Sequence, residues 1–129
     1  MENKIIEIGY GHVNKVEIGN KLPLAFIGGP CAIESREHAF KMAEMIGDVC
    51  KRLDIPWIYK SCYDKDCRSS PESFHGVGVD DGLRILQDIR ENFGLPVVSD
   101  FSDFSIFLSF LILAFFDFSF FGDLYSCAT

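Results

Sequence analysis

Apolar strands that alternate with amphipathic helices are the strongest constraint on how the first hundred residues fold. Short apolar runs occupy 24–27, 56–59 and 95–100, and two segments with helical spacing of apolar residues, 36–53 and 80–93, lie between them. Alternating strands and helices are typical of a parallel β-sheet whose strands are joined by right-handed crossovers. The pattern therefore predicts an α/β fold.

The ends of the two helices and an N-terminal hairpin are also encoded locally. Ser35 is expected to cap the first helix and Asp80 the second, because short polar side chains accept hydrogen bonds from the first turn of a helix. Gly94 is expected to end the second helix. Alternating residues at 4–8 and 15–18, around a glycine-containing turn, predict a β-hairpin.

Charge and cysteine content exclude some functional classes. The 129 residues carry a formal net charge of -7, which argues against a nucleic-acid-binding surface but not against a pocket for a small anion. Five cysteines without dense spacing fit reduced thiols better than a disulfide framework. With no secretory signal in the first residues, the expected location is the cytoplasm.

The C-terminal segment 104–129 differs sharply from the rest. It holds eight of the 13 Phe residues and no Lys or Arg. Its apolar run over 104–116 is shorter than the roughly 20 residues that span a membrane, and Asp117 interrupts any extension. We expect two parts, 1–103 and an apolar tail over 104–129, with a membrane span as the less favoured alternative.

Three cations and a serine follow the second strand of the predicted sheet: Lys60, Lys65, Arg68 and Ser69. Ligand sites of parallel α/β folds lie at the carboxyl ends of the strands. Lysine supplies a point charge and arginine a two-pronged donor, so these residues form a candidate cradle for phosphate or carboxylate. The alternative is a solvated loop whose neighbouring aspartates neutralise the cations.

Cysteines suggest two possible metal sites. Cys31 follows a Gly-Gly-Pro sequence after the first strand of the predicted sheet, and it is either a soft metal ligand or a small buried apolar residue. Cys62 and Cys67 together with His75 could be read as a zinc site, but the spacing and the single histidine make this signal weak.

Four sequence blocks resemble 3-deoxy-8-phosphooctulonate synthase, also called KDO 8-phosphate synthase. They are GGPCAIES (28–35), K-x4-K-x2-RSS (60–70), SFHGVGVDDGLRIL (73–86) and FGLPVVSD (93–100). Their order and spacing agree with that family. The resemblance covers about residues 4–100, and the tail matches no part of the family.

The resemblance implies a (β/α)8 barrel that condenses phosphoenolpyruvate with arabinose 5-phosphate and releases phosphate, in lipopolysaccharide biosynthesis. It also implies a homo-oligomer for the full-length family. Such a barrel needs about 250 residues, so this chain would supply a hairpin, three strands and two helices of a truncated barrel. A frameshift or a truncated gene is our hypothesis for the origin of the tail.

The resemblance also assigns roles to individual residues. Lys60 and Lys65 would contact phosphoenolpyruvate, and Arg68 and Ser69 would hold the phosphate of arabinose 5-phosphate. Asp100 matches an acidic residue near the sugar, and we expect it to be catalytic together with the two lysines.

Cys31 matches the position that ligates a divalent metal in one subclass of the family, where the metal-independent subclass has Asn. Two departures from the family concern the sugar site. Asp66 and Cys67 replace the usual Ala-Asn before the arginine, and Ser102 replaces a histidine.

Two alternatives stay open. The sister enzyme 3-deoxy-7-phosphoheptulonate synthase, of the shikimate pathway, shares a sequence similar to RSSPESFHGVG, but Tyr63-Asp64-Lys65 before the arginine favours the octulonate enzyme. The other alternative is an inactive fragment that folds poorly or needs a partner chain.

Overall fold

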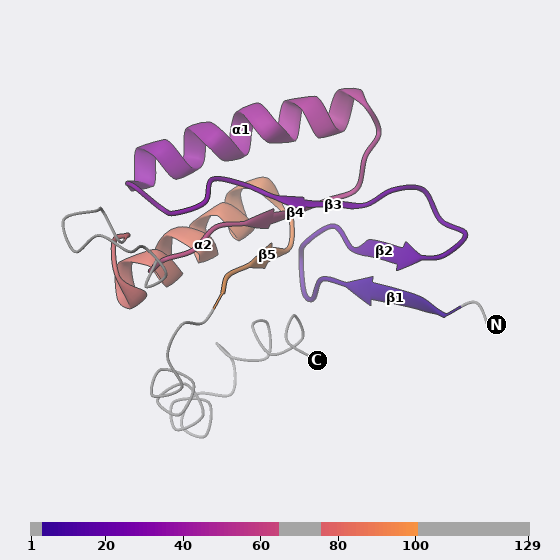
Figure 1. Ribbon diagram of the computed structural model, residues 1–129, viewed down its shortest axis with the longest axis horizontal. Helices are drawn as coiled ribbons and strands as arrows, with labels where there is room; N and C mark the ends of the chain where they lie inside the picture. Colours follow the sequence, from indigo (N-terminus) through magenta and orange to yellow (C-terminus); the bar gives the residue numbers. More distant parts are fainter. Residues whose placement is uncertain (1–3, 65–75, 101–129) are drawn as a thin grey trace, which may run out of the picture.

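The computed structural model describes residues 4–64 and 76–100, which form two small sheets and two helices (Figure 1). In chain order the elements are β1 (Ile5–Ile8), β2 (Val16–Gly19), β3 (Phe26–Gly28), α1 (Arg36–Arg52), β4 (Trp57–Lys60), α2 (Val79–Phe93) and β5 (Val97–Val98). Several predictions fall outside the described residues: those on Lys65, Arg68 and Ser69, on the zinc candidates Cys67 and His75, and on the tail 104–129.

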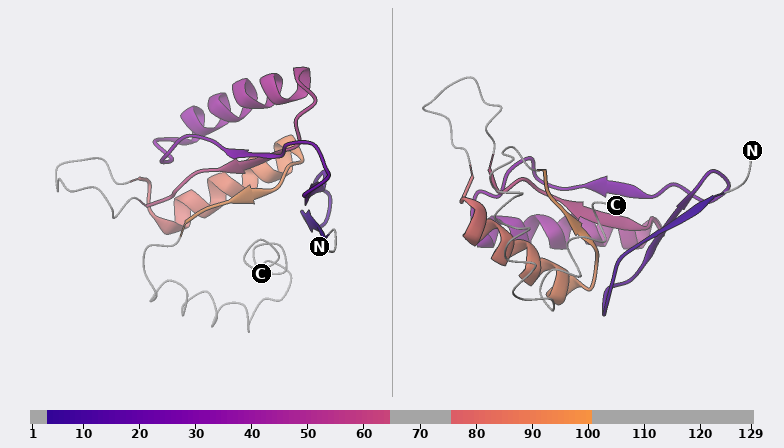
Figure 2. Two further views of the ribbon diagram at one scale, coloured as in Figure 1. Left: turned by 45° about the vertical axis from the view of Figure 1, so that its right-hand side comes forward. Right: turned by 90° about the horizontal axis from the view of Figure 1, so that it is seen from below.

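The main sheet has three parallel strands in the order β3-β4-β5. Phe26 pairs with Trp57 at one boundary, and Tyr59 pairs with Val97 at the other. Both helices lie on the same side of this sheet, as the view from below shows (Figure 2). The predicted mixed α/β architecture with a parallel sheet is therefore confirmed, while closure into a barrel is not shown.

The predicted N-terminal hairpin is also confirmed. β1 and β2 pair antiparallel, with Ile8 opposite Val16. Two hydrogen bonds tie the loop between these strands to the end of α2: the Asn14 amide donates to the Gly94 carbonyl at 2.7 Å, and Arg90 Nη2 donates to the Tyr10 carbonyl at 2.5 Å. The hairpin is thus attached where α2 ends.

Helix α1 begins as the sequence predicts. The Ser35 hydroxyl accepts a hydrogen bond from the His38 amide at 3.1 Å, which satisfies one of the amides that a helix start leaves without a partner. Ala39, Ala43 and Cys50 are buried along one face of the helix. The three- and four-residue spacing of small apolar side chains therefore marks the face that packs on the sheet.

Helix α2 begins one residue before the predicted cap, so the expectation for Asp80 was wrong. The N-cap is Gly78, with a φ of 87°, and it makes no side-chain hydrogen bond to the first turn. Asp80 and Asp81 lie inside that first turn, where the partial positive charge of the helix N-terminus favours carboxylates. Gly94 ends the helix in the left-handed conformation, as predicted.

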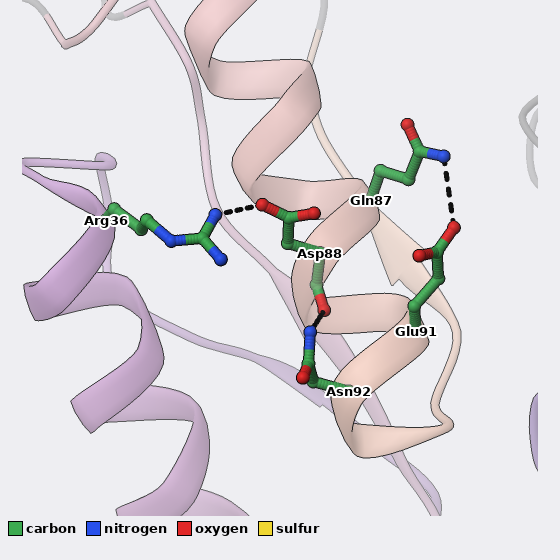
Figure 3. A network of polar contacts seen from close by, with 5 residues as sticks. All are labelled: Arg36, Gln87, Asp88, Glu91 and Asn92. Carbon is green, nitrogen blue, oxygen red and sulfur yellow. Dashed lines mark hydrogen bonds and ion pairs between the residues drawn. The ribbon is translucent and has the colours of Figure 1, made fainter.

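The two helices contact each other through one aromatic and one charged pair. The rings of Phe40 and Phe93 lie 5.7 Å apart between centroids. Arg36 lies over the Phe40 ring at 4.6 Å and forms an ion pair with Asp88 (Figure 3). Asn92 also donates a hydrogen bond to the Asp88 carbonyl, at 2.7 Å. The Phe40–Phe93 and Arg36–Asp88 contacts join the two helices over the sheet, whereas the hydrogen bond from Asn92 lies within α2.

Large apolar side chains in β3 and just before it are exposed. Leu24 is 76% exposed, Phe26 41% and Ile27 49%. Within the described residues β3 pairs only with β4, so its other edge presents backbone groups beside apolar side chains. No helix in the described part of the chain is long and apolar enough to cross a membrane.

We predict that the 129-residue chain by itself self-associates through this edge, because exposed apolar edge strands template pairing with other chains. Size-exclusion chromatography should show oligomers or aggregates, and heating should give no sharp cooperative transition. The double variant Leu24→Lys/Ile27→Lys should reduce association, because charged residues protect edge strands. Glu17→Lys, which adds positive charge on the hairpin instead, is the matched control. A monomeric, cooperatively unfolding wild-type sample would contradict this prediction.

Candidate active site

Four candidate side chains lie at the carboxyl ends of the three parallel strands: Cys31 after β3, Lys60 and Cys62 at the end of β4 and just beyond it, and Asp100 after β5. A parallel bridge between Ala32 and Cys62 continues the β3–β4 pairing beyond the strands themselves. The carboxyl ends of parallel strands share one edge, which is where ligands bind in α/β proteins. The structure thus brings these side chains to the edge where the sequence predicts the site, and their role in binding stays a prediction.

A glycine allows the backbone to pass closely at this edge. A Cβ atom at Gly29 would lie 2.2 Å from the carbonyl oxygen of Lys60, so no larger residue fits without moving β4. The Ser61 hydroxyl donates to the Pro30 carbonyl at 2.8 Å, and the Ser61 amide donates to the Val98 carbonyl at 3.3 Å. Ser61 thus joins all three strand ends directly behind Lys60.

Lys60 and Asp100 form an ion pair at the rim of the sheet. Lys60 Nζ lies 3.0 Å from Asp100 Oδ2, and the thiol of Cys62 donates to the same oxygen at 3.3 Å. The Lys60 side chain is 41% exposed and that of Asp100 62%. The pair is therefore open to solvent and to small solutes.

The contacts fix the charge state of this cluster near neutral pH. The hydrogen bond to Asp100 raises the pKa of Lys60, and the charge of the carboxylate acts in the same direction. The hydrogen bonds from Lys60 and Cys62 lower the pKa of Asp100. Burial, followed by the contact with Asp100, raises the pKa of the Cys62 thiol. The cluster consequently holds an ammonium, a carboxylate and a neutral thiol.

This arrangement is suited to binding anions rather than to nucleophilic attack. A lysine ammonium has three donors, so a contact with one carboxylate oxygen leaves room for a phosphate or carboxylate ligand. A lysine whose pKa is raised stays protonated and is a poor nucleophile. Lys60 therefore suits the predicted role of contacting an anionic substrate.

Two tyrosines pack against the site from the helix side, and sequence reasoning did not assign them a role. Tyr59 and Tyr63 are fully buried, and burial raises the pKa of Tyr59 to about 12. A Cβ atom at Gly82 would lie 2.2 Å from Cβ of Tyr63, and one at Gly76 would lie 2.2 Å from the Tyr63 carbonyl oxygen. The glycines at 76 and 82 were the available sequence signal, since glycine marks close backbone approach.

The described residues do not complete a metal site. They contain no group of three His, Cys, Asp or Glu side chains placed to hold a metal ion. Cys31 is exposed at the end of β3, in a position to supply one thiolate ligand, whereas Cys62 is engaged with Asp100. Cys31 was predicted as a metal ligand, and this stays a prediction.

Comparison with known proteins assigns the chain to a family. The model of the DAHP synthetase I family matches residues 4–111. This chain belongs to that family. The match reaches past residue 103, where the sequence analysis placed the boundary of the barrel part.

Curated relatives carry a more specific name. A 2-dehydro-3-deoxyphosphooctonate aldolase of Acidithiobacillus ferrooxidans is 54% identical over 84 residues, which is 65% of this chain and 30% of that protein. Proteins of the same name from Marinobacter nauticus and Bordetella petrii are 48% and 51% identical, over 69% and 65% of this chain and 32% and 30% of their own lengths. The chain therefore spans about 30% of the length of these relatives. The predicted resemblance to KDO 8-phosphate synthase over the N-terminal part is confirmed.

The three described cysteines should differ in reactivity toward iodoacetamide. We expect Cys31, which is exposed, to be alkylated first, and Cys62 and Cys50 to react more slowly, because burial raises the pKa of both thiols. A thiol with a raised pKa is mostly protonated at neutral pH, so labelling of Cys62 should increase strongly between about pH 7 and about pH 9.

Peptide mass spectrometry after brief labelling would measure the order of alkylation. The urea-unfolded chain, in which these thiols should react at similar rates, is the control. Labelling of Cys62 as fast as that of Cys31 at neutral pH would contradict the structure at this site.

Proposed function

We propose that this chain carries the N-terminal part of a KDO 8-phosphate synthase active site. The reaction condenses phosphoenolpyruvate with arabinose 5-phosphate to 3-deoxy-D-manno-octulosonate 8-phosphate and phosphate. The observation that supports this most directly is the exposed, protonated Lys60 at the carboxyl end of the sheet, held by Asp100. The names and identities of the curated relatives support the same reaction.

The chemistry explains why cations are needed at this edge. Carbon three of phosphoenolpyruvate must bond to the aldehyde carbon of the sugar, water adds at carbon two, and inorganic phosphate leaves. Both substrates are anions and repel each other. Fixed cations align the two reacting carbons and offset that repulsion, which lowers the barrier by positioning and by electrostatic stabilisation.

The residue roles follow from the family resemblance together with the geometry. Lys60 and Lys65 contact phosphoenolpyruvate, and Arg68 and Ser69 contact the sugar phosphate. Asp100 acts on the sugar side. The 3.0 Å contact between Lys60 and Asp100 supports these roles, because residues that contact two substrates joined by a new bond must lie close together.

We further propose that the complete enzyme is a cytoplasmic homo-oligomer. We also propose that Cys31 supplies one ligand to a divalent metal in that enzyme. A thiolate suits zinc, iron and similar ions. The exposed position of Cys31 at the end of β3 supports the proposal. The other ligands would come from residues outside those that the structure describes.

In an enzyme completed with the missing part of the barrel, exhaustive chelation should abolish phosphate release, and added divalent metal should restore it. Cys31→Asn is the informative variant, because asparagine binds these metals poorly. Metal analysis of the purified Cys31→Asn variant should show loss of bound metal. Unchanged activity of the Cys31 enzyme after exhaustive chelation would contradict the metal role.

For the 129-residue chain, we expect phosphoenolpyruvate to protect Lys60 from acylation by an N-hydroxysuccinimide ester, because the bound anion covers the ammonium. Lys15 is the internal control, since it also pairs with a carboxylate, Glu7, but lies on the hairpin. Peptide mass spectrometry would give the ratio of labelling at the two lysines.

A phosphate-release assay with both substrates should show little or no turnover by this chain. Phosphoenolpyruvate that protects Lys15 as much as Lys60 would contradict the proposed site. Phosphate release that requires both substrates would instead contradict the expectation that this part alone is inactive.

A further inference from the structure

The backbone of Cys62 is held at the edge of the sheet, next to Lys60 and Asp100. Its carbonyl accepts a hydrogen bond from the Ile33 amide at 2.9 Å, and its backbone bridges to Ala32. Asp100, in contrast, lies beyond the end of β5 with a side chain that is 62% exposed. The backbones of Lys60 and Cys62 are thus both held by the sheet, whereas the exposed carboxylate of Asp100 is the group whose orientation depends on its side-chain contacts.

Cys62 forms a direct hydrogen bond with Asp100. Its thiol donates to Oδ2 of Asp100 at 3.3 Å, and Lys60 Nζ contacts the same oxygen at 3.0 Å. Lys60 and Cys62 are two residues apart at the end of β4, so both project from the same face of the sheet. One carboxylate oxygen thus accepts from a flexible ammonium and from an anchored thiol.

We propose that Cys62 is a positioning residue that fixes the Asp100 carboxylate against Lys60, and so presents the lysine ammonium in one orientation to the anionic substrate. This inference rests on the proposed function of Lys60. It gives Cys62 a role in place of the weak zinc interpretation of the sequence.

The protonation state of Cys62 supports this role. Burial raises the pKa of its thiol, so that the S–H donor needed for the contact is present at neutral pH. Among residues 4–64 and 76–100, the titratable groups that act on the charge of Lys60 are Asp100, Cys62 and Cys31, one from each strand end. The thiol of Cys62 donates to Asp100, and a serine hydroxyl at position 62 would also donate.

The test is acylation of Lys60 in the full chain, measured by peptide mass spectrometry relative to Lys15 and Lys41. Cys62→Ala removes the donor and should raise relative labelling of Lys60 on the order of threefold, as expected for the loss of one exposed hydrogen bond. Cys62→Ser retains a donor and should restore the wild-type ratio. Asp100→Asn should raise the ratio at least as much as Cys62→Ala.

Cys50→Ser is the matched control, because it also replaces a thiol but lies in the buried face of α1. It should leave the relative labelling of Lys60 unchanged. General loss of structure would also raise the labelling of Lys15 relative to the exposed Lys41, because it would break the ion pair between Lys15 and Glu7, and this separates unfolding from a local effect on Lys60.

Adding phosphoenolpyruvate separates the inference from the function on which it rests. Cys62→Ala should need about threefold more phosphoenolpyruvate for half-maximal protection of Lys60, and Cys62→Ser should not. If phosphoenolpyruvate protects Lys60 but Cys62→Ala behaves as wild type, the positioning role is wrong and the proposed function stands. If Cys62→Ala raises labelling but phosphoenolpyruvate protects no variant, the contact is confirmed and the proposed function is wrong.

Discussion

The pairing of β4 with strands on both sides is the interaction on which the rest of the structure depends. β4 is the central strand of the sheet, and Trp57 and Tyr59 pack from it into the core beneath both helices. The next residue on the strand, Lys60, belongs to the site. Because β3 and β5 bond to β4 in parallel, Cys31 and Asp100 arrive at the same edge. The same four-residue strand, β4, thus supplies side chains to the core and to the candidate site.

Close backbone contacts at two glycines hold the residues around the candidate site in place. Gly29 lets the chain after β3 pass the Lys60 carbonyl, and Gly82 lets α2 pack directly on Tyr63. A side chain at either position would overlap its neighbour, and overpacking of this kind typically costs about 1–3 kcal/mol. Tyr63 is therefore fixed between β4 and α2, just before the segment that carries Lys65 and Arg68.

Local patterns in the sequence predicted most of the fold but only part of the site. Helical spacing and the Ser35 cap located α1, since both signals act within one turn. The Asp80 prediction failed because Gly78, with its positive φ, already starts the helix. The contact between Cys62 and Asp100 joins residues 38 positions apart, and no local pattern encodes such a pair. The strand order predicted that Lys60 and Asp100 lie at the same edge of the sheet. That Lys60 and Cys62 contact the same oxygen of Asp100 could be seen only in the structure.

Charge balance indicates what the described part can do by itself. The positive charge of Lys60 is matched by the carboxylate of Asp100, so the pair brings almost no net charge to the edge. Two anionic substrates brought together need an excess of cations, because their repulsion must be offset where the new bond forms. Within this chain that excess would come from Lys65 and Arg68. In relatives of which the 84 matched residues make up only 30%, further strands can add cations. The Lys60–Asp100 pair alone therefore suits the binding of one anion, which can replace the carboxylate as the partner of Lys60. The condensation of two anions requires further cations around this pair.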